Sequence, residues 1–230
     1  MKKLLVLFAL FCLVFSGACA AGKIQVDMEN FYLIQAYSNY GCAFAKVTNT
    51  GDRMVKINAA LLEVYNADGE ALSSEDYFQS SAQYLEPGEM AYVRMRADIQ
   101  QDDMEAVDDY MLTITGKSEK DTKNLRLPCT DMQYEHIEER YFERDYLCAT
   151  VTNNTDQIVY GIDTDLVALD SEGKILYIDD ESTFSDVGLM PGSSLRVRVE
   201  VPSAFMDYYK ASNISIAAVD AVAAIEVKLN

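Results

Sequence analysis

Apolar and polar residues alternate strictly along several short segments of this chain. In LRVRVEV (195–201), apolar side chains take every second position and charged side chains take the positions between them. AYVRMRA (91–97) follows a similar alternation. A period of two is typical of a β-strand that has one face in a core and the other in water. Because no long segment has a helical period, the pattern predicts an all-β protein.

These two segments belong to an internal repeat. Positions 47–96 match positions 151–200 at an offset of 104 residues, with 15 identities and no gap. Each copy of the repeat is about the size of one domain. The repeat therefore predicts two tandem domains, at 23–127 and 128–230, and we expect each of them to fold independently.

Turn residues separate the apolar segments within each copy. Gly69 and Gly173 each follow an acidic residue between two apolar runs, and Gly88 and Gly192 each follow a proline. Glycine supplies the positive φ that such tight turns require. Many short strands with turns between them predict a β-sandwich. In the first copy we expect strands near 24–32, 41–49, 54–66, 70–77, 90–96, 110–115 and 124–127. A helical turn or two is expected within 98–109 and 202–212.

The N-terminal segment predicts secretion. Lys2 and Lys3 precede a 12-residue apolar run (4–15), and small residues follow it. This order is that of a secretory signal peptide, and the run is shorter than the roughly 20 residues of a membrane-spanning helix. We therefore expect residues 1–20 to be a signal peptide and the mature protein to be extracytoplasmic.

Two cleavage patterns overlap at Cys19. Ala18-Cys19-Ala20 fits the small-x-small site of ordinary signal peptidase. Ser16-Gly17-Ala18-Cys19 resembles a lipobox, in which Cys19 would be lipidated and become the first residue. Ser16 stands where a lipobox usually carries leucine. Free secretion and a lipid anchor at Cys19 both remain open, and we expect membrane contact only through the signal peptide or that anchor.

The repeated segments resemble a known family. Each copy runs from a V-T-N strand through LLEVYNADGEAL to LEPGE, or through LVALDSEGKIL to LMPGS. These runs resemble the FxLYD-type domains and related immunoglobulin-like modules of bacterial envelope proteins. Residues 64–66 and 168–170 stand where that family carries its aromatic-x-Leu-Tyr-Asp-like strand end. The resemblance covers most of each copy and implies two tandem immunoglobulin-like β-sandwich domains at a bacterial surface. It implies no catalytic residues.

The charge of the chain excludes some partners. Its formal net charge is −18 at pH 7, which repels nucleic-acid phosphates and anionic lipid. We therefore expect no nucleic-acid partner.

Motifs for catalysis, cofactors and metals are missing from the sequence. The single histidine, His136, lies in an acidic and aromatic stretch, and the sequence has no G-x-S-x-G, glycine-rich phosphate loop or H-E-x-x-H motif. The acidic pairs lack the spacing of a calcium loop. We expect no catalytic residue, no cofactor and no metal site.

Aromatic residues gather at the same place in both copies, before the second predicted strand. Exposed aromatic side chains are frequent anchors of binding surfaces, although tyrosine also packs at sandwich edges. This cluster is the predicted binding surface, and its members are Tyr32, Tyr37, Tyr40, Tyr141, Phe142 and Tyr146.

Cys129 and Cys148 fall on the first and second predicted strands of the second copy. Antiparallel pairing folded about residues 138 and 139 would set them opposite each other. We therefore predict a disulfide between them, with Cys42 buried and free.

These observations favour a non-enzymatic binding or spacer protein of the bacterial cell envelope. Its partner would be an unknown protein or envelope component. One alternative is a lipid-anchored accessory subunit of a surface complex. A third is a glycan hydrolase that uses an acidic pair.

Overall fold

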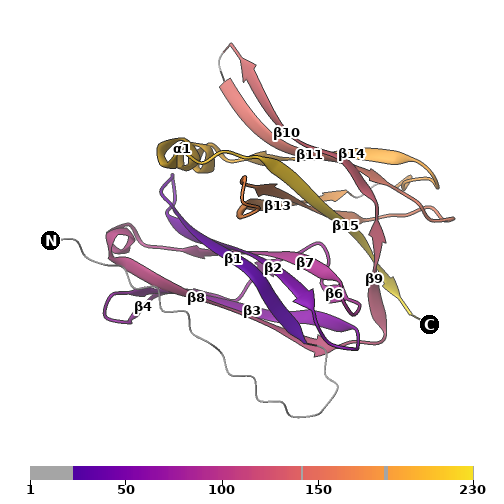
Figure 1. Ribbon diagram of the computed structural model, residues 1–230, viewed down its shortest axis with the longest axis horizontal. Coiled ribbons are helices and arrows are strands. Elements are labelled where there is room, and N and C mark those ends of the chain that lie inside the picture. Colours follow the sequence, from indigo (N-terminus) through magenta and orange to yellow (C-terminus); the bar gives the residue numbers. More distant parts are fainter. Residues whose placement is uncertain (1–22, 141, 184–185, 230) are drawn as a thin grey trace.

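The computed structural model describes residues 23–140, 142–183 and 186–229 (Figure 1). Strands make up 63% of the structure, and two short helices accompany them, so the predicted all-β class is confirmed. The helices are η1 (Gln101–Ala106) and α1 (Ser203–Ser212), which lie in the two segments where helical turns were expected. Within the described part of the chain, neither is long and apolar enough to cross a membrane. Cys19 and the predicted signal peptide lie outside the described residues.

The first half of the structure, from β1 to β8, contains two antiparallel sheets. One sheet has the order β1-β2-β7-β5, and in the other β3 pairs with β4, β6 and β8. The strands are β1 (Ile24–Ile34), β2 (Tyr40–Asn49), β3 (Val55–Asn66), β4 (Ala71–Glu75), β5 (Phe78–Gln79), β6 (Tyr84–Leu85), β7 (Met90–Asp98) and β8 (Val107–Ser118). The two sheets make a sandwich-like arrangement.

The second half, from β9 to β15, also contains two antiparallel sheets, with the orders β10-β11-β14 and β13-β12-β15-β9. Its strands are β9 (Thr122–Leu127), β10 (Cys129–Glu139), β11 (Phe142–Thr152), β12 (Ile162–Leu169), β13 (Ile175–Thr183), β14 (Ser194–Val201) and β15 (Ala218–Lys228). Helix α1 connects β14 to β15.

Strand β9 lies in the second half. The sequence assigned 124–127 to the first copy as its last strand, but β9 pairs with β15, with Leu125 opposite Ile225. Strand β8 instead takes the last place in the first half, beside β3. One strand from before the boundary expected at residue 127 thus belongs to a sheet of the second half.

Equivalent residues of the two sequence copies make equivalent hydrogen bonds in the structure. The side-chain amide of Asn49 donates to the carbonyls of Arg53 and Leu85. Asn153, 104 residues later, donates to the carbonyls of Gln157 and Leu189 in the same way. Both asparagines are fully buried. Because a buried amide without partners is costly, each asparagine fixes the loop around it.

The predicted turn glycines also adopt the expected conformation. Gly69, Gly88, Gly173 and Gly192 have φ between 73° and 83°, a region that side chains with a Cβ rarely enter. The repeat therefore duplicates turn geometry as well as strands.

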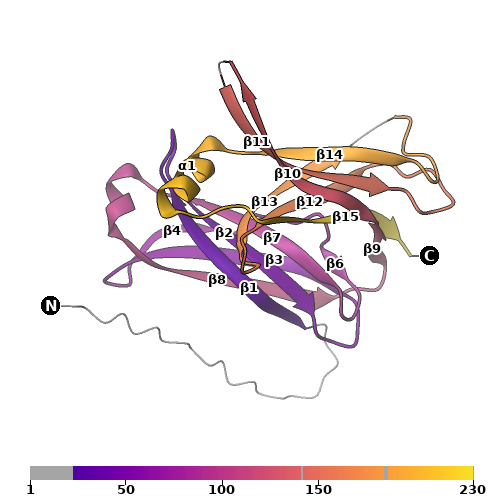
Figure 2. The ribbon, with the colours of Figure 1, turned by 45° about the horizontal axis from the view of Figure 1, so that its top comes forward.

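The two halves share one core. The sheet that contains β1, β2 and β7 lies against β13 and α1 of the second half (Figures 1 and 2). Tyr32 and Phe44 of the first half contact the ring of Phe205 in α1, with centroids 6.3 and 6.0 Å apart. The buried apolar residues of both halves form a single continuous cluster. Strand β2 is accordingly buried on both faces over Tyr40–Ala45, unlike a strand with one wet face.

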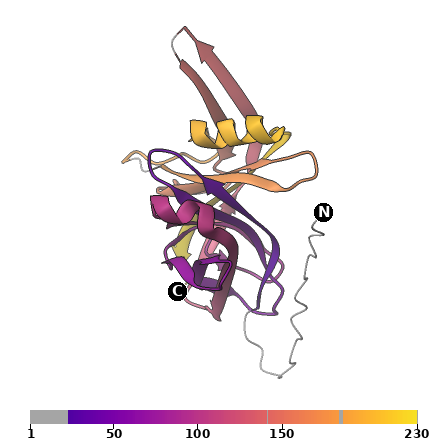
Figure 3. The same cartoon turned by 90° about the vertical axis from the view of Figure 1, so that its left-hand side faces the viewer.

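One hairpin projects from this body. Strand β11 pairs with β14 only from Asp145 onward, while β10 and β11 continue to pair as far as Glu139 and Phe142. The end of this hairpin therefore extends past the sheet (Figures 1 and 3).

Candidate functional site

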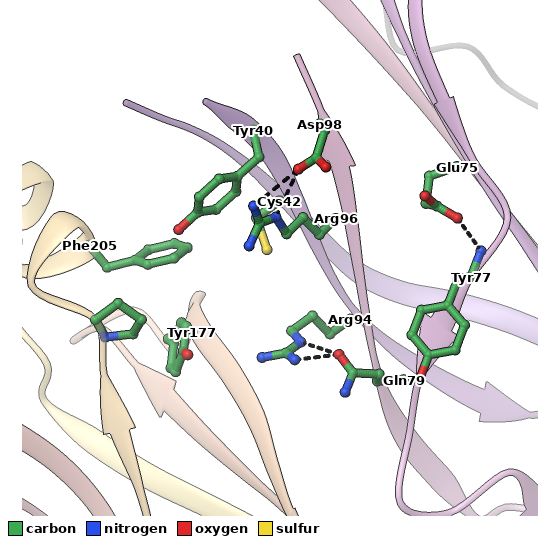
Figure 4. Close-up of a pocket in the computed structure, with 11 residues that line it drawn as sticks. Tyr40, Cys42, Glu75, Tyr77, Gln79, Arg94, Arg96, Asp98, Tyr177 and Phe205 are labelled. Atoms are coloured by element: carbon green, nitrogen blue, oxygen red, sulfur yellow. Dashed lines mark hydrogen bonds and ion pairs between the residues drawn. The ribbon is translucent and has the colours of Figure 1, made fainter. Parts of the chain in front are cut away.

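A cavity of about 280 Å³ lies where the two halves meet (Figure 4). The first half contributes residues from β2, β7 and the β4–β5 segment, and the second half contributes residues from β13 and α1. The lining residues are Tyr40, Cys42, Glu75, Tyr77, Gln79, Arg94, Arg96, Asp98, Tyr177, Pro202 and Phe205. A larger hollow of about 570 Å³ beside η1 is lined by the first half alone, without an aromatic ring.

The alternation of β7 places its two arginines on one side of the sheet. Arg94 and Arg96 are two residues apart, so both point toward the second half, while Val93 and Met95 are buried in the first-half core. On the neighbouring strand β2, Cys42 pairs with Arg96 and therefore brings its thiol to the same face. Two adjacent strands thus build the base of the cavity.

Arg94 connects the halves. Its guanidinium donates to Asp179 and to Gln79, and it donates to the carbonyl of Ile178 at 3.4 Å. Gln79 in turn donates to Asp180 at 2.9 Å. Burial lowers the pKa of Arg94, but the charge of Asp179 and other neighbours outweighs burial and the net shift is upward. Arg94 therefore remains a cation whose donors are largely occupied by the protein.

Arg96 lies on the more open side of the cavity. Its guanidinium stacks on the ring of Tyr40 at 3.9 Å from the centroid and donates to Asp98 at 3.1 Å. It also donates to the hydroxyl of Ser38 at 2.9 Å. The side chain of Arg96 is 48% exposed, compared with 21% for Arg94. Part of the Arg96 guanidinium consequently still faces the cavity.

Aromatic rings form two walls. Phe205 and Tyr177 of the second half contact each other edge to face at 5.0 Å, and Tyr40 lies 6.4 Å from Phe205. Opposite them stands Tyr77, which is 69% exposed and is labelled on the far side of the cavity in Figure 4. Neither the Tyr40 nor the Tyr77 hydroxyl is hydrogen-bonded to a described residue. The cavity therefore offers ring faces together with two available hydroxyls.

The lining of the cavity also contains one thiol and two carboxylates. Burial raises the pKa of the Cys42 thiol to about 12, so it is protonated and a poor nucleophile at neutral pH. Glu75 accepts hydrogen bonds from the backbone of Asp76 and Tyr77, and Asp98 pairs with Arg96. Each of these carboxylates therefore already accepts hydrogen bonds from within the protein.

The described residues of the cavity do not include a set of metal ligands. Across 23–140, 142–183 and 186–229, no group of three or more His, Cys, Asp or Glu side chains is arranged to hold a metal ion.

The structure does not gather the predicted aromatic surface in one place. Tyr32 is 5% exposed and Tyr40 is 8% exposed, because the second half covers both rings. Tyr146 is 8% exposed and lies under the guanidinium of Arg198. Tyr37 and Phe142 are exposed, but Tyr37 is in the β1–β2 loop and Phe142 is on the projecting hairpin. Tyr141 lies outside the described residues.

The predicted disulfide is not formed. Cys42, Cys129 and Cys148 are free thiols. Strands β10 and β11 do pair as expected, but the hairpin reverses after Glu139, which lies opposite Phe142. Because the reversal comes two residues later than assumed, Cys129 faces Val151 and Cys148 faces Gln133.

Of the residues that line the cavity, only Tyr40 belongs to the binding surface predicted from the sequence. Arg94 and Arg96 occupy the polar positions of an alternating strand, which ordinarily face water. One signal was available: GCAFA (41–45) and ILYI (175–178) are apolar without alternation, as strands covered on both faces are. That signal predicts that another layer covers β2 and β13, and the cavity lies at the edge of that layer.

Comparisons with known proteins give little further information. No protein-family model matches the sequence, and no curated protein matches it. The crystal structure of red sea bream transglutaminase is similar over 76% of this chain and 27% of its own chain, with 12% sequence identity and a TM-score of 0.21. The chain thus spans about a quarter of the length of that enzyme, and a TM-score this low does not establish a shared fold.

Proposed function

We propose that this protein is a non-enzymatic binding protein of the bacterial cell envelope that works outside the cytoplasm. The ligand binds in the cavity between the two halves. The observation that carries this proposal is that both halves line the same cavity, with Arg94 and Arg96 on one side and Tyr177 and Phe205 on the other. Small-molecule sites are often found where two domains meet.

The fixed arrangement of the lining supports a binding role. Arg94 is held by Asp179 and Gln79, and Phe205 packs among buried aromatic rings of both halves. A site whose side chains are held before the ligand arrives loses less conformational freedom on binding.

In this proposal each half is an immunoglobulin-like β-sandwich module. Two antiparallel sheets in each half support that assignment, as does the shared role of Asn49 and Asn153. Both asparagines belong to the V-T-N segments on which the resemblance to FxLYD-type domains rests.

Export of the protein is part of the same proposal. Lys2, Lys3 and the apolar run that follows them support a signal peptide, and Cys19 offers a site for a lipid anchor. Labelling of growing cells with a palmitate analogue separates the two forms. A lipoprotein incorporates the label and loses it in Cys19→Ser, whereas a freely secreted protein never incorporates it.

The projecting hairpin favours a second candidate function, that of an anchored accessory subunit in a surface complex. Phe142 at its end is 43% exposed, and the hairpin stands clear of the body (Figure 3). Exposed aromatics on a projecting element are suited to contact another protein. For this candidate, Phe142→Ser abolishes co-purification of a partner while Tyr77→Ala leaves it unchanged.

A thermal-shift screen tests the proposed binding function. The purified protein is heated with fractionated small molecules from bacterial envelopes, alongside Tyr77→Ala and the matched control Tyr160→Ala. Tyr77 is 69% exposed and Tyr160 is 56% exposed, but only Tyr77 lines the cavity. We expect at least one fraction to stabilise the wild type and Tyr160→Ala but not Tyr77→Ala.

Two results would contradict that expectation. If no fraction stabilises the wild type, or if every active fraction stabilises all three proteins alike, the cavity is not the binding site. Products released from a glycan panel, and lost in both Glu75→Gln and Asp98→Asn, would instead support the hydrolase alternative.

A further inference from the structure

The cavity between the halves also indicates what kind of ligand it takes. This step rests on the proposed function, because it assumes that the cavity binds a small molecule. Three properties of the lining limit the ligand: its charge, its hydrogen-bonding groups and its aromatic faces.

Both arginines of the cavity are already paired with carboxylates of the protein. Arg94 is paired with Asp179, and Arg96 is paired with Asp98 at 3.1 Å. An anionic ligand would have to displace one of these carboxylates and would also approach a chain of net charge −18. A cationic ligand would face both guanidinium groups. An anion gains no free cation, and a cation gains only Glu75 while both guanidinium groups repel it, so the desolvation cost of either charge is poorly offset.

The hydrogen-bonding groups of the lining include both acceptors and donors. Glu75 and Asp98 are carboxylates, which only accept. The guanidinium of Arg96 donates, and the hydroxyls of Tyr40 and Tyr77 do both. The ligand group that satisfies such a mixed lining is a hydroxyl, since it donates one hydrogen bond and accepts others.

Ring faces complete the lining. The exposed ring of Tyr77 stands across the cavity from Tyr40 and Phe205 (Figure 4). An aromatic face carries partial negative charge and attracts C–H bonds that are polarised by neighbouring oxygen atoms. A pyranose ring presents such C–H bonds on one face and hydroxyls around its edge.

We infer that the cavity binds a neutral sugar, as one or two pyranose units. The volume of about 280 Å³ agrees with a short ligand, because sites for drug-sized molecules begin at roughly 300 Å³. Tyr77 supplies the stacking face, and Glu75, Asp98 and Arg96 hydrogen-bond to the ring hydroxyls.

Ligand-observed NMR titrations test this inference with sugars that differ in charge on the same ring. The neutral probes are glucose, galactose, mannose, N-acetylglucosamine and the disaccharides cellobiose and chitobiose. The charged probes are glucosamine and glucuronate. We expect at least one neutral probe to bind and both charged probes to bind at least about tenfold more weakly, a difference of about 1.4 kcal/mol.

Variants connect that binding to the cavity. We expect Tyr77→Ala to weaken the neutral sugar about tenfold or more, and Tyr160→Ala to change its affinity less than about twofold. Glu75→Gln keeps the hydrogen-bonding shape but removes the charge. We expect Glu75→Gln to change the affinity for a neutral ligand less than about threefold. For a cationic ligand, the same substitution should weaken binding by a much larger factor.

Three results would overturn the inference. The first is that no neutral sugar binds at concentrations up to about 10 mM. The second is that glucosamine or glucuronate binds more tightly than every neutral probe, and the third is that sugar binding survives Tyr77→Ala unchanged. The first two results would reject only the assignment of a neutral sugar. The proposed binding function would still stand if a different ligand from the thermal-shift screen bound in the cavity.

Discussion

Ser81 of the first half donates two hydrogen bonds to Asp165 of the second half, from its backbone N–H at 3.0 Å and from its hydroxyl at 2.8 Å. Asp165 is only 1% exposed. Burial raises the pKa of its carboxyl to about 7, and the hydrogen bonds from Ser81 oppose that rise without cancelling it. The nearby charge of Asp180 also raises the pKa, while Arg126 lowers it.

Stability should therefore depend on pH through Asp165. The folded protein holds this proton more tightly than the unfolded chain, in which the carboxyl has the ordinary aspartate pKa of 3.8. The resulting stabilisation is fully present below about pH 4 and is lost as the pH rises through about 7. Relative to Asp165→Asn, the wild type should lose about 2–3 kcal/mol of unfolding free energy between pH 5 and pH 8. Urea titrations at the two pH values measure this difference.

Asp108→Asn serves as the control for that experiment. Asp108 is exposed on β8, so its replacement should shift stability equally at both pH values. If the pH profiles of the wild type and Asp165→Asn run parallel, Asp165 is ionised throughout and burial does not dominate at this position.

Arg94 should contribute more to stability than Arg96 does. Replacing Arg94 with methionine leaves Asp179 and Gln79 without their main partner at a partly buried position. We expect a loss of about 2–3 kcal/mol, because unpaired polar groups retain their desolvation cost. Arg96→Met, at a half-exposed side chain, should cost less than about 1 kcal/mol. Urea unfolding of both variants makes the comparison.

A double variant isolates the contribution of the ion pair. The double variant Arg94→Met/Asp179→Asn should lose less unfolding free energy than the two single variants lose in sum. The difference should be about 1 kcal/mol or more, because each single change already removes the ion pair. Strict additivity would mean that the pair itself contributes nothing.

The strands were predictable because their physical cause is local. The alternation in AYVRMRA and LRVRVEV reports which residues face a core, and β7 and β14 follow those segments. The turns were predictable for the same reason. Gly88 and Gly192 need positive φ whatever the rest of the fold does.

The pairing between distant segments was not predictable in this way. Nothing local to 124–127 indicates that β9 pairs with β15 rather than with a strand of its own copy. Likewise, Asp165 and Ser81 are 84 residues apart, and neither segment by itself predicts their contact. The cavity depends on such contacts between the halves, so most of its residues appeared in the sequence as ordinary strand or loop positions.

The shared core predicts that the halves unfold together. Phe205 is 2% exposed and contacts rings from both halves, including Phe44 at 6.0 Å and Tyr177 at 5.0 Å. Differential scanning calorimetry should show one transition whose calorimetric and van't Hoff enthalpies agree. A chain truncated after residue 121 should lack that transition, because it exposes Phe44 and Tyr32. Two separate transitions would instead support the independent folding expected from the repeat.

Replacing Phe205 with alanine should destabilise the whole protein by about 3–5 kcal/mol, the usual cost of removing a buried phenylalanine. The matched control is Phe142→Ala. Because Phe142 is 43% exposed, its replacement should lower the free energy of unfolding by less than about 1 kcal/mol. Equal effects of the two changes would mean that the aromatic cluster does not hold the halves together.

Cys42, Cys129 and Cys148 should react as free thiols. Cys129 faces Val151 and Cys148 faces Gln133, so a disulfide between them would require the pairing of β10 and β11 to shift. Without reductant, alkylation in denaturant followed by peptide mass spectrometry should label Cys42, Cys129 and Cys148 alike. In the folded protein, Cys129 should react first, since it is half-buried while Cys42 and Cys148 are buried. If Cys42 alone is labelled in denaturant, the disulfide exists and the register of this hairpin is different.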